Sequence, residues 1–179
     1  MTYGSEPVTV PVVSEPITYD RANGFQKYLR RFASSGPGSW IFARSAHHID
    51  RPVYRLTRGR HTFGSLVGGL PVVMLTTTGA KSGQPRTVPV LGIPSDDGLA
   101  IIASNFGQYR HPAWYHNLRA NPEADVAVDG VQRHVQAVEA IGDRRARIWK
   151  EGLRTYPGFD QYEERASHRQ ISVFVLEPV

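Results

Sequence analysis

A short polar stretch between two apolar runs carries residue types that could hold an anion. Residues 75–90 read LTTTGAKSGQPRTVPV, with two glycines and the cations Lys81 and Arg86 in one loop. Glycine permits backbone conformations that other residues avoid, so successive N–H groups there can form a concave nest for an anion such as phosphate. Further neutral donors are Thr76, Thr77, Thr78, Ser82 and Gln84. The alternative interpretation is a polar hairpin turn with a charged tip.

A second stretch joins a strand-like run to aromatic and imidazole side chains. The apolar residues 99–103 lead into Ser104 and Asn105, and a short helix-like segment follows. That segment contributes His111, Trp114, Tyr115 and His116. Polar strand ends beside aromatic side chains could line a pocket for a flat aromatic ligand. Alternatively, Trp114 and Leu118, which are four residues apart on one helix face, simply pack in the core.

The sequence lacks the residues that several other kinds of chemistry require. It contains no cysteine, which excludes disulfides, thiolate metal ligands and thiol nucleophiles. It has no Walker loop, no Rossmann fingerprint and no Gly-x-Ser-x-Gly elbow. His47, His48 and Asp50 lie close together in the sequence, but adjacent side chains point apart on a helix. We therefore expect no metal site.

The formal net charge of +5 is concentrated in one block of the chain. Residues 1–20 carry three acidic side chains and no basic one, whereas residues 21–60 carry nine basic side chains and one aspartate. Residues 61–179 are balanced, with twelve of each sign. A basic block attracts an anionic ligand, an anionic membrane surface or nucleic acid. We expect no nucleic acid partner, because the aromatic residues of the block fall largely on the apolar face of a predicted helix.

The N-terminal part is predicted to hold an extended arm and an amphipathic helix. Residues 1–19 contain three prolines and read as an arm that is disordered unless it docks on a partner subunit. The apolar stripe of the helix at residues 23–34 includes Phe25, Tyr28, Leu29 and Phe32. This helix either packs on the rest of the protein or lies on a membrane surface. With no secretion signal and no apolar run of ~20 residues, we expect a cytoplasmic protein, either free or at the inner face of the membrane.

The rest of the pattern predicts an α+β fold with a small antiparallel sheet or barrel. Turn signals such as Pro94-Ser95-Asp96-Asp97-Gly98 separate short apolar runs. The predicted strands cover residues 72–77, 87–93, 99–104, 124–128, 131–141 and 171–176. The predicted helices cover residues 111–122, 143–155 and 160–166. We expect one domain over residues 20–179, of which residues 20–60 form a basic helical part.

Three motifs, in this order and spacing, carry a resemblance to a known family. They are LTTTGAKSGQPRTVPV, IIASNFGQYRHPAWYHNLRANPEADVAV and YPGFDQYEERASHRQISVFVLEP. From about Asp50 to the C-terminus the chain resembles the deazaflavin-dependent nitroreductases and quinone reductases. The resemblance implies a split β-barrel of about six strands, like that of flavin reductases, with flanking helices. It also implies binding of the deazaflavin coenzyme F-420 and hydride transfer to a quinone-like, nitroaromatic or other conjugated acceptor.

The resemblance further implies a role for individual residues. The loop would hold the coenzyme phosphate, and the end of the third strand would lie against the deazaflavin ring. The implied coenzyme-binding residues are Thr78, Gly79, Lys81, Ser82, Gln84, Arg86, Pro89, Ala103, Ser104, Asn105 and Trp114. Ser104, Tyr156 and Tyr162 would orient or protonate the acceptor, for which Leu91 and Phe159 would form part of the binding surface.

Four positions depart from the best-known nitroreductases of the family. Leu91 and Phe159 stand where those members carry tyrosines, Asn105 replaces a lysine and Ala80 replaces a basic residue. Fewer acceptor-side hydroxyls favour quinones over bulky nitro compounds. Two alternatives stay open: a non-catalytic protein that stores or delivers the deazaflavin, and an enzyme of the same barrel type that uses flavin mononucleotide. The sequence is compatible with a monomer or a homodimer.

Overall fold

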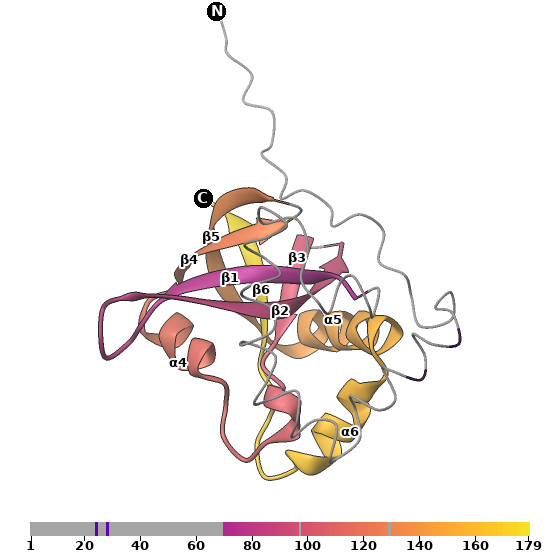
Figure 1. The fold of residues 1–179 in the computed structure, drawn as a ribbon. Coiled ribbons are helices and arrows are strands. Elements are labelled where there is room, and N and C mark those ends of the chain that lie inside the picture. The colour runs from indigo at the N-terminus through magenta and orange to yellow at the C-terminus, as the bar shows by residue number, and fades with distance from the viewer. Residues whose placement is uncertain (1–23, 25–27, 29–69, 97, 129) are drawn as a thin grey trace, which may run out of the picture.

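Six strands, all antiparallel to their neighbours, form the centre of the molecule (Figure 1). The computed structural model describes residues 70–96, 98–128 and 130–179, together with Gly24 and Tyr28. Its strands are β1 (Val72–Thr78), β2 (Pro85–Ser95), β3 (Gly98–Ile102), β4 (Glu123–Val128), β5 (Val131–Ala140) and β6 (Val173–Pro178). They close into a barrel in the order β1-β2-β3-β6-β5-β4. Closure leaves the barrel without a free sheet edge.

The strand alternation distributes apolar side chains between two cores. One core cluster lies inside the barrel and draws on all six strands, with Leu75, Ile101 and Leu176 among its fully buried members. The alternate residues of β3 and β6, such as Ile102 and Val175, point outward into a second cluster. Because successive side chains of a strand face opposite ways, β3 and β6 read as continuous apolar runs that serve both cores.

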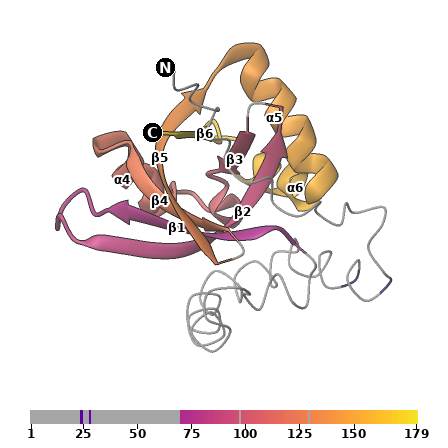
Figure 2. The same ribbon diagram turned by 90° about the horizontal axis from the view of Figure 1, so that it is seen from above.

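In the described part of the chain, three helices cover the barrel. Helix α4 (Ala113–Ala120) packs against β1 and contributes Trp114 and Leu118 to the inner core. Helices α5 (Gly142–Thr155) and α6 (Gly158–Arg165) supply the second core cluster over β2, β3 and β6. Viewed from above, α5 and α6 lie on one side of the barrel and the β1–β2 hairpin loop extends on the other (Figure 2).

The structure confirms the predicted α+β split barrel, its six strands and the flanking helices. The main differences are at element ends. β2 begins at Pro85 rather than residue 87, because the ladder with β1 extends to the pair Thr78 and Pro85. β3 ends at Ile102 rather than residue 104, since the backbone leaves the ladder and enters a tight turn at Asn105–Gly107. Ser104 and Asn105 indicated in the sequence that the strand ends here, but they did not indicate that its hydrogen bonds to neighbouring strands stop at Ile102.

Several N-terminal predictions lie outside the described residues. These concern the arm at residues 1–19, the basic part at residues 20–60, and all of the helix at residues 23–34 except Gly24 and Tyr28. The histidines at 47 and 48 with Asp50 also fall in this part of the chain. Within the described residues, no helix is both long and apolar enough to span a membrane.

Candidate functional site

A groove separates the loop of the β1–β2 hairpin from helix α4. Its volume is about 830 Å³, within the range of small-molecule sites. Its walls are formed by Met74, Thr77, Gly79, Ala80, Lys81, Ser82, Pro85, Arg86, Thr87, Val88, Ala113, Trp114, His116 and Asn117. Lys81 and Arg86 are exposed at its rim, whereas Met74 and Trp114 form apolar surface deeper in the wall. The groove therefore offers positive charge at one end and an apolar, aromatic surface beside it.

The shape of the loop depends on its two glycines. The Gly79 N–H donates to the Gln84 carbonyl at 2.9 Å, and the Gly83 N–H donates to the Gly79 carbonyl at 2.8 Å. A Cβ at Gly79 would lie 2.6 Å from Ser82 Oγ, so no larger side chain fits without a shift. Gly83 has a φ of +64°, the left-handed region that glycine adopts at little cost. Both positions hold the tight turn that the sequence predicted.

The backbone amides of this loop are already used within the protein. Besides the two glycine amides, the Ser82 N–H donates to the Gly79 carbonyl, and the Gln84 N–H donates to Ser82 Oγ. The Ala80 N–H donates to the side chain of Asn117. Five of the six amides from residue 79 to residue 84 thus have a partner. An anion at this loop would meet mainly side chains: Lys81, Arg86 and the Ser82 hydroxyl, which lies 3.5 Å from Arg86 Nη2.

Asn117 ties the loop to helix α4. Its Oδ1 accepts from the Ala80 N–H at 3.0 Å and its Nδ2 donates to Thr77 Oγ1 at 2.9 Å. The asparagine is buried, and both of its contacts cross about forty residues of sequence. Sequence reasoning missed this residue. The available signal was a polar amide on the helix face that also carries Trp114, since a buried amide needs partners.

A second polar region follows β3. The backbone of Asn105, Phe106 and Gly107 turns in the left-handed region, with φ values of 48°, 56° and 73°. For the two residues that have a Cβ, this conformation costs roughly 1–2 kcal/mol each. The turn is packed against α6: a Cβ at Gly107 would lie 3.0 Å from Tyr162 Cα. Such strain persists only where surrounding contacts fix it, and it is common at functional sites.

Four of the predicted acceptor-side residues come together on the outer face of the barrel, whereas Ser104 lies in the segment after β3. The hydroxyls of Tyr156 and Tyr162 are 3.0 Å apart, and both residues are 3% exposed. The ring of Phe159 packs edge-on against both tyrosines, and Leu91 packs on the same cluster. Gly158 permits this packing, because a Cβ there would lie 2.4 Å from the Tyr156 ring. The residues form one buried aromatic cluster next to the left-handed turn.

The structure thus divides the predicted site residues between two places. Gly79, Lys81, Ser82, Arg86 and Trp114 line the groove. The other coenzyme-binding candidates do not: Thr78, Gln84, Pro89, Ala103, Ser104 and Asn105. Of these, the last three lead from β3 into the left-handed turn, near the tyrosine cluster. The hairpin loop and α6 lie on opposite sides of the barrel in both views, and the segment before α4 runs between them (Figures 1 and 2).

His111 lies on this connecting segment. Its ring stacks on Tyr115 with a centroid distance of 4.0 Å and meets His116, a wall residue of the groove, edge-on at 6.1 Å. Burial, with a further contribution from the positive charge of Arg169, lowers the pKa of His111 below 6.5. The imidazole is therefore held in its neutral form near neutral pH.

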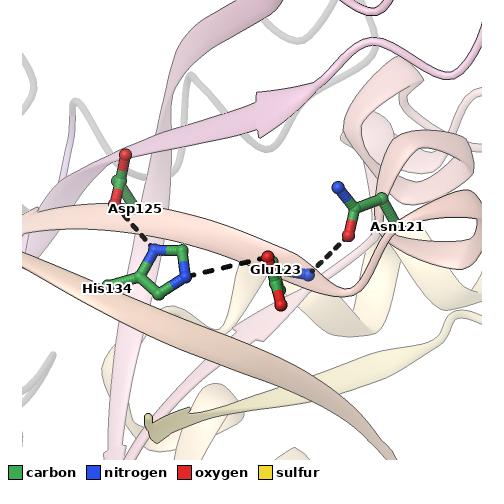
Figure 3. Close-up of polar contacts among 4 residues, drawn as sticks. All are labelled: Asn121, Glu123, Asp125 and His134. Atoms are coloured by element: carbon green, nitrogen blue, oxygen red, sulfur yellow. Dashed lines mark hydrogen bonds and ion pairs between the residues drawn. The ribbon is translucent and has the colours of Figure 1, made fainter.

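A third polar cluster stands apart from both regions, on the surface of β4 and β5 (Figure 3). His134 Nδ1 lies 3.1 Å from Asp125 and its Nε2 lies 3.9 Å from Glu123. Asp125 and His134 are direct neighbours across the antiparallel pair, and all three side chains are exposed. Exposed ion pairs of this kind contribute little free energy. We assign the cluster no role in the site.

Comparison with known proteins identifies the family of this chain. The family profile described as F420H(2)-dependent quinone reductase matches residues 47–178. The F420H(2)-dependent quinone reductase Rv1261c of Mycobacterium tuberculosis is 38% identical over 128 residues, covering 69% of this chain and 84% of that protein.

Two solved structures are also similar. An F420-H2-dependent reductase, FDR-A, is 38% identical, with a TM-score of 0.55 over 60% of this chain and 94% of that one. A chain described as a domain-swapped dimer is 32% identical, with a TM-score of 0.57 over 79% of this chain and 100% of that one. The matched region includes the barrel, the groove and the tyrosine cluster. The chain belongs to the F420H(2)-dependent quinone reductase family.

Proposed function

We propose that this chain is an oxidoreductase that takes hydride from the reduced deazaflavin coenzyme F-420 and passes it to a quinone. The observation that carries the site assignment is the groove beside α4, where Lys81, Arg86 and Ser82 converge on a glycine turn. In this proposal the coenzyme phosphate binds at these three side chains. The ring end of the coenzyme lies toward Ala103, Ser104 and Asn105, across the segment that contains His111.

The residues present fit such a coenzyme. Two exposed cations and a hydroxyl are the donor set that a phosphate requires. Gly79 leaves the loop open where a Cβ would collide with Ser82. Trp114 and Met74 add apolar surface to the wall of the groove. The groove is also large and open enough for a molecule longer than a single phosphate group.

When bound, the reduced coenzyme supplies the hydride, so the protein contributes orientation and proton handling. Ser104, two residues after the end of β3, would hydrogen-bond the acceptor. Tyr156 and Tyr162 would hold a proton near the acceptor oxygen, because a phenol both donates and accepts a hydrogen bond. Leu91, which is only partly buried, would give the acceptor side an apolar surface, and the buried Phe159 would support it from within the cluster. Such a surface favours flat, weakly polar quinones.

The partner is a small molecule. The oligomeric state, monomer or homodimer, stays a prediction. The cytoplasmic location and the membrane contact of residues 23–34 also stay predictions. Two functions compete with this proposal: a protein that stores or delivers the deazaflavin, and an enzyme that uses flavin mononucleotide. Measurements of coenzyme binding and of quinone turnover distinguish the three.

The test is a titration of the purified protein with oxidised coenzyme F-420 and, in parallel, with flavin mononucleotide, followed by fluorescence. The Lys81→Ala/Arg86→Ala double variant is compared with the wild type. We expect at least a tenfold weaker affinity for the deazaflavin, about 1.4 kcal/mol, because two cations leave the phosphate site. Quinone reduction is then measured with the reduced coenzyme.

The matched control is the Lys150→Ala/Arg154→Ala double variant. It removes the same charges from exposed positions of α5, away from the groove. Its affinity for the coenzyme should equal that of the wild type. Equal losses in both double variants would mean that net charge, not the loop, sets the affinity. Binding without quinone turnover would support the storage protein, and tight binding of flavin mononucleotide alone would support the flavin enzyme.

A further inference from the structure

One arginine near the C-terminus forms hydrogen bonds with four residues of the connection between β3 and α4. Arg169 lies half-buried between α6 and β6. Its Nη2 donates to the carbonyls of Ser104 and Gln108 at 2.9 and 3.1 Å, and its Nη1 donates to the Ala103 carbonyl at 3.4 Å. Its Nε donates to the Gln108 carbonyl at 3.3 Å. A single guanidinium thus reaches three backbone carbonyls, as only its planar fork of donors allows.

These carbonyls stand on both sides of the left-handed turn. Ala103 and Ser104 precede Asn105 and Phe106, and Gln108 follows them. Within the turn, the Gly107 N–H donates to the Ser104 carbonyl and the Gln108 N–H donates to the Asn105 carbonyl, both at 3.0 Å. Because Asn105 and Phe106 are not glycines, the turn needs outside contacts to stay in this conformation. Arg169 supplies such contacts at its start and its end.

The same guanidinium also reaches the imidazole of His111, with 3.3 Å between Nη1 and Nδ1. An arginine has no acceptor, so in this contact Nδ1 must accept. The proton of the neutral ring is then on Nε2. One side chain therefore sets both the backbone of the turn and the tautomer of the histidine that follows it.

We propose that Arg169 is the positioning residue for the ring end of the coenzyme site: it fixes the left-handed turn after β3 and holds His111 as the Nε2-protonated tautomer. This proposal rests on the proposed function, in which Ala103, Ser104 and Asn105 lie against the deazaflavin ring. Hydride transfer depends steeply on the alignment of donor and acceptor, so the support of this backbone matters more for turnover than for affinity.

Other ionisable groups surround His111 and must be considered in any titration. Tyr115 and His116 approach from α4, Glu139 from β5, and His168 from the segment that carries Arg169. The acidic group is Glu139, which raises the pKa of His111, and it is paired with Arg119 at 2.6 Å. Burial, Arg169 and both histidines lower that pKa.

The first test reads the tautomer directly and needs no coenzyme. Two-bond proton–nitrogen NMR spectra of the wild type should show His111 with an unprotonated Nδ1 at neutral pH. In Arg169→Met both tautomers should appear, and the pKa of His111 should rise because a positive charge is lost. Arg169→Lys keeps the charge but not the fork, so the pKa should stay low. A wild-type ring protonated on Nδ1 would overturn the proposal, even if neither variant folds.

The second test separates positioning from simple stability. In both Arg169 variants we expect kcat for quinone reduction to fall about ten- to hundredfold. The dissociation constant of coenzyme F-420 should change less than threefold, because the proposed phosphate site is at Lys81, Ser82 and Arg86 in the hairpin loop. The control is Arg145→Lys, since Arg145 also donates to a backbone carbonyl, that of Ile171, but does not touch the turn. Its kcat should stay within twofold of the wild-type value.

The possible results are distinguishable. An unchanged kcat in Arg169→Lys, or an equal loss in Arg145→Lys, would contradict a positioning role. A wild type that neither binds the deazaflavin nor reduces quinones would refute the proposed function instead, and the tautomer measurement would still report on the contact itself.

Discussion

The hairpin loop at residues 79–84 and the turn at residues 105–107 both end a strand, and both contain a glycine in the left-handed region. They differ in what surrounds them. A Cβ at Gly83 would meet no atom within 4 Å, whereas a Cβ at Gly107 would lie 3.0 Å from Tyr162 Cα and from Arg165 Cβ. The loop is closed largely by its own hydrogen bonds and has an exposed, cationic tip. The turn is held by helix α6 and by Arg169, which are distant in sequence.

In the proposed function, the two regions build a binding surface in different ways. An anion is recognised by charge, and long exposed cations can adapt to it, so a short local turn is sufficient. A flat reacting ring needs a fixed backbone, and a strained turn that tertiary contacts hold provides one. We therefore expect substitutions at the loop to change affinity more than stability. Substitutions at the turn and the tyrosine cluster should change stability first.

The largest effect is expected in the tyrosine cluster. Phe159→Ala removes a ring that is 2% exposed and packs against Tyr156 and Tyr162. The change should lower the free energy of unfolding by about 3–5 kcal/mol, because it leaves a cavity in the second core. Denaturant unfolding of the variant and of Lys81→Ala provides the measurement. A comparable loss in Lys81→Ala would contradict the contrast between the two regions.

Gly83 in the loop and Gly107 in the turn allow the two regions to be compared with the same substitution. Gly83→Ala should cost about 1 kcal/mol, the penalty of placing a Cβ in the left-handed region. Gly107→Ala carries the same penalty and in addition forces apart the turn and α6, for a total of about 3 kcal/mol. Thermal unfolding of both variants measures the difference. If Gly83→Ala and Gly107→Ala lost the same stability, α6 would be able to move away from the turn at no cost in free energy.

Asn117→Ala tests whether the groove depends on a buried contact. The variant leaves the Ala80 N–H without its partner and removes the hydrogen bond to Thr77 Oγ1. We expect a loss of about 1–3 kcal/mol in stability together with weaker coenzyme binding. Asn121→Ala is the control, since Asn121 accepts from the Glu123 N–H outside the groove. Unchanged binding in Asn117→Ala would mean that the loop keeps its shape without α4.

The smallest effect concerns pH. The pKa of His111 is lowered in the folded protein, so the unfolded chain binds the proton more readily. The contribution of His111 to stability is therefore complete above about pH 6.5 and is lost as the pH falls through its folded-state pKa. Unfolding measured between pH 5 and pH 8 should show this decline in the wild type and a smaller one in His111→Gln. If the wild type and His111→Gln lost stability equally between pH 8 and pH 5, His111 would not cause the decline.

Much of the fold could be predicted from the sequence. Alternation of apolar residues and turn signals such as Pro94-Ser95-Asp96-Asp97-Gly98 are local, and they predicted the six strands and three helices that the described part of the chain contains. The cationic loop was also recognisable, because its glycines and charges are adjacent in the chain. Helical spacing offered core packing of Trp114 and Leu118 as one of two alternatives, and both side chains are in the inner core, where Trp114 also lines the groove. Tyr156, Phe159 and Tyr162 were expected on one surface, but not that they would pack into a buried cluster.

The sequence by itself determined the hairpins and the cationic residues of the loop, because these depend on residues a few positions apart. Local patterns left a small antiparallel sheet or a barrel open, and the split barrel was implied by the family resemblance. Only the tertiary structure decided that Asn117 ties the loop to a helix 37 residues away, and that Arg169 reaches the Ala103 carbonyl across 66 residues. It also decided that the loop amides are used internally and that Asn105 and Phe106 are left-handed. Such contacts arise when the barrel closes, since closure brings distant polar groups together and each buried group must then find a partner.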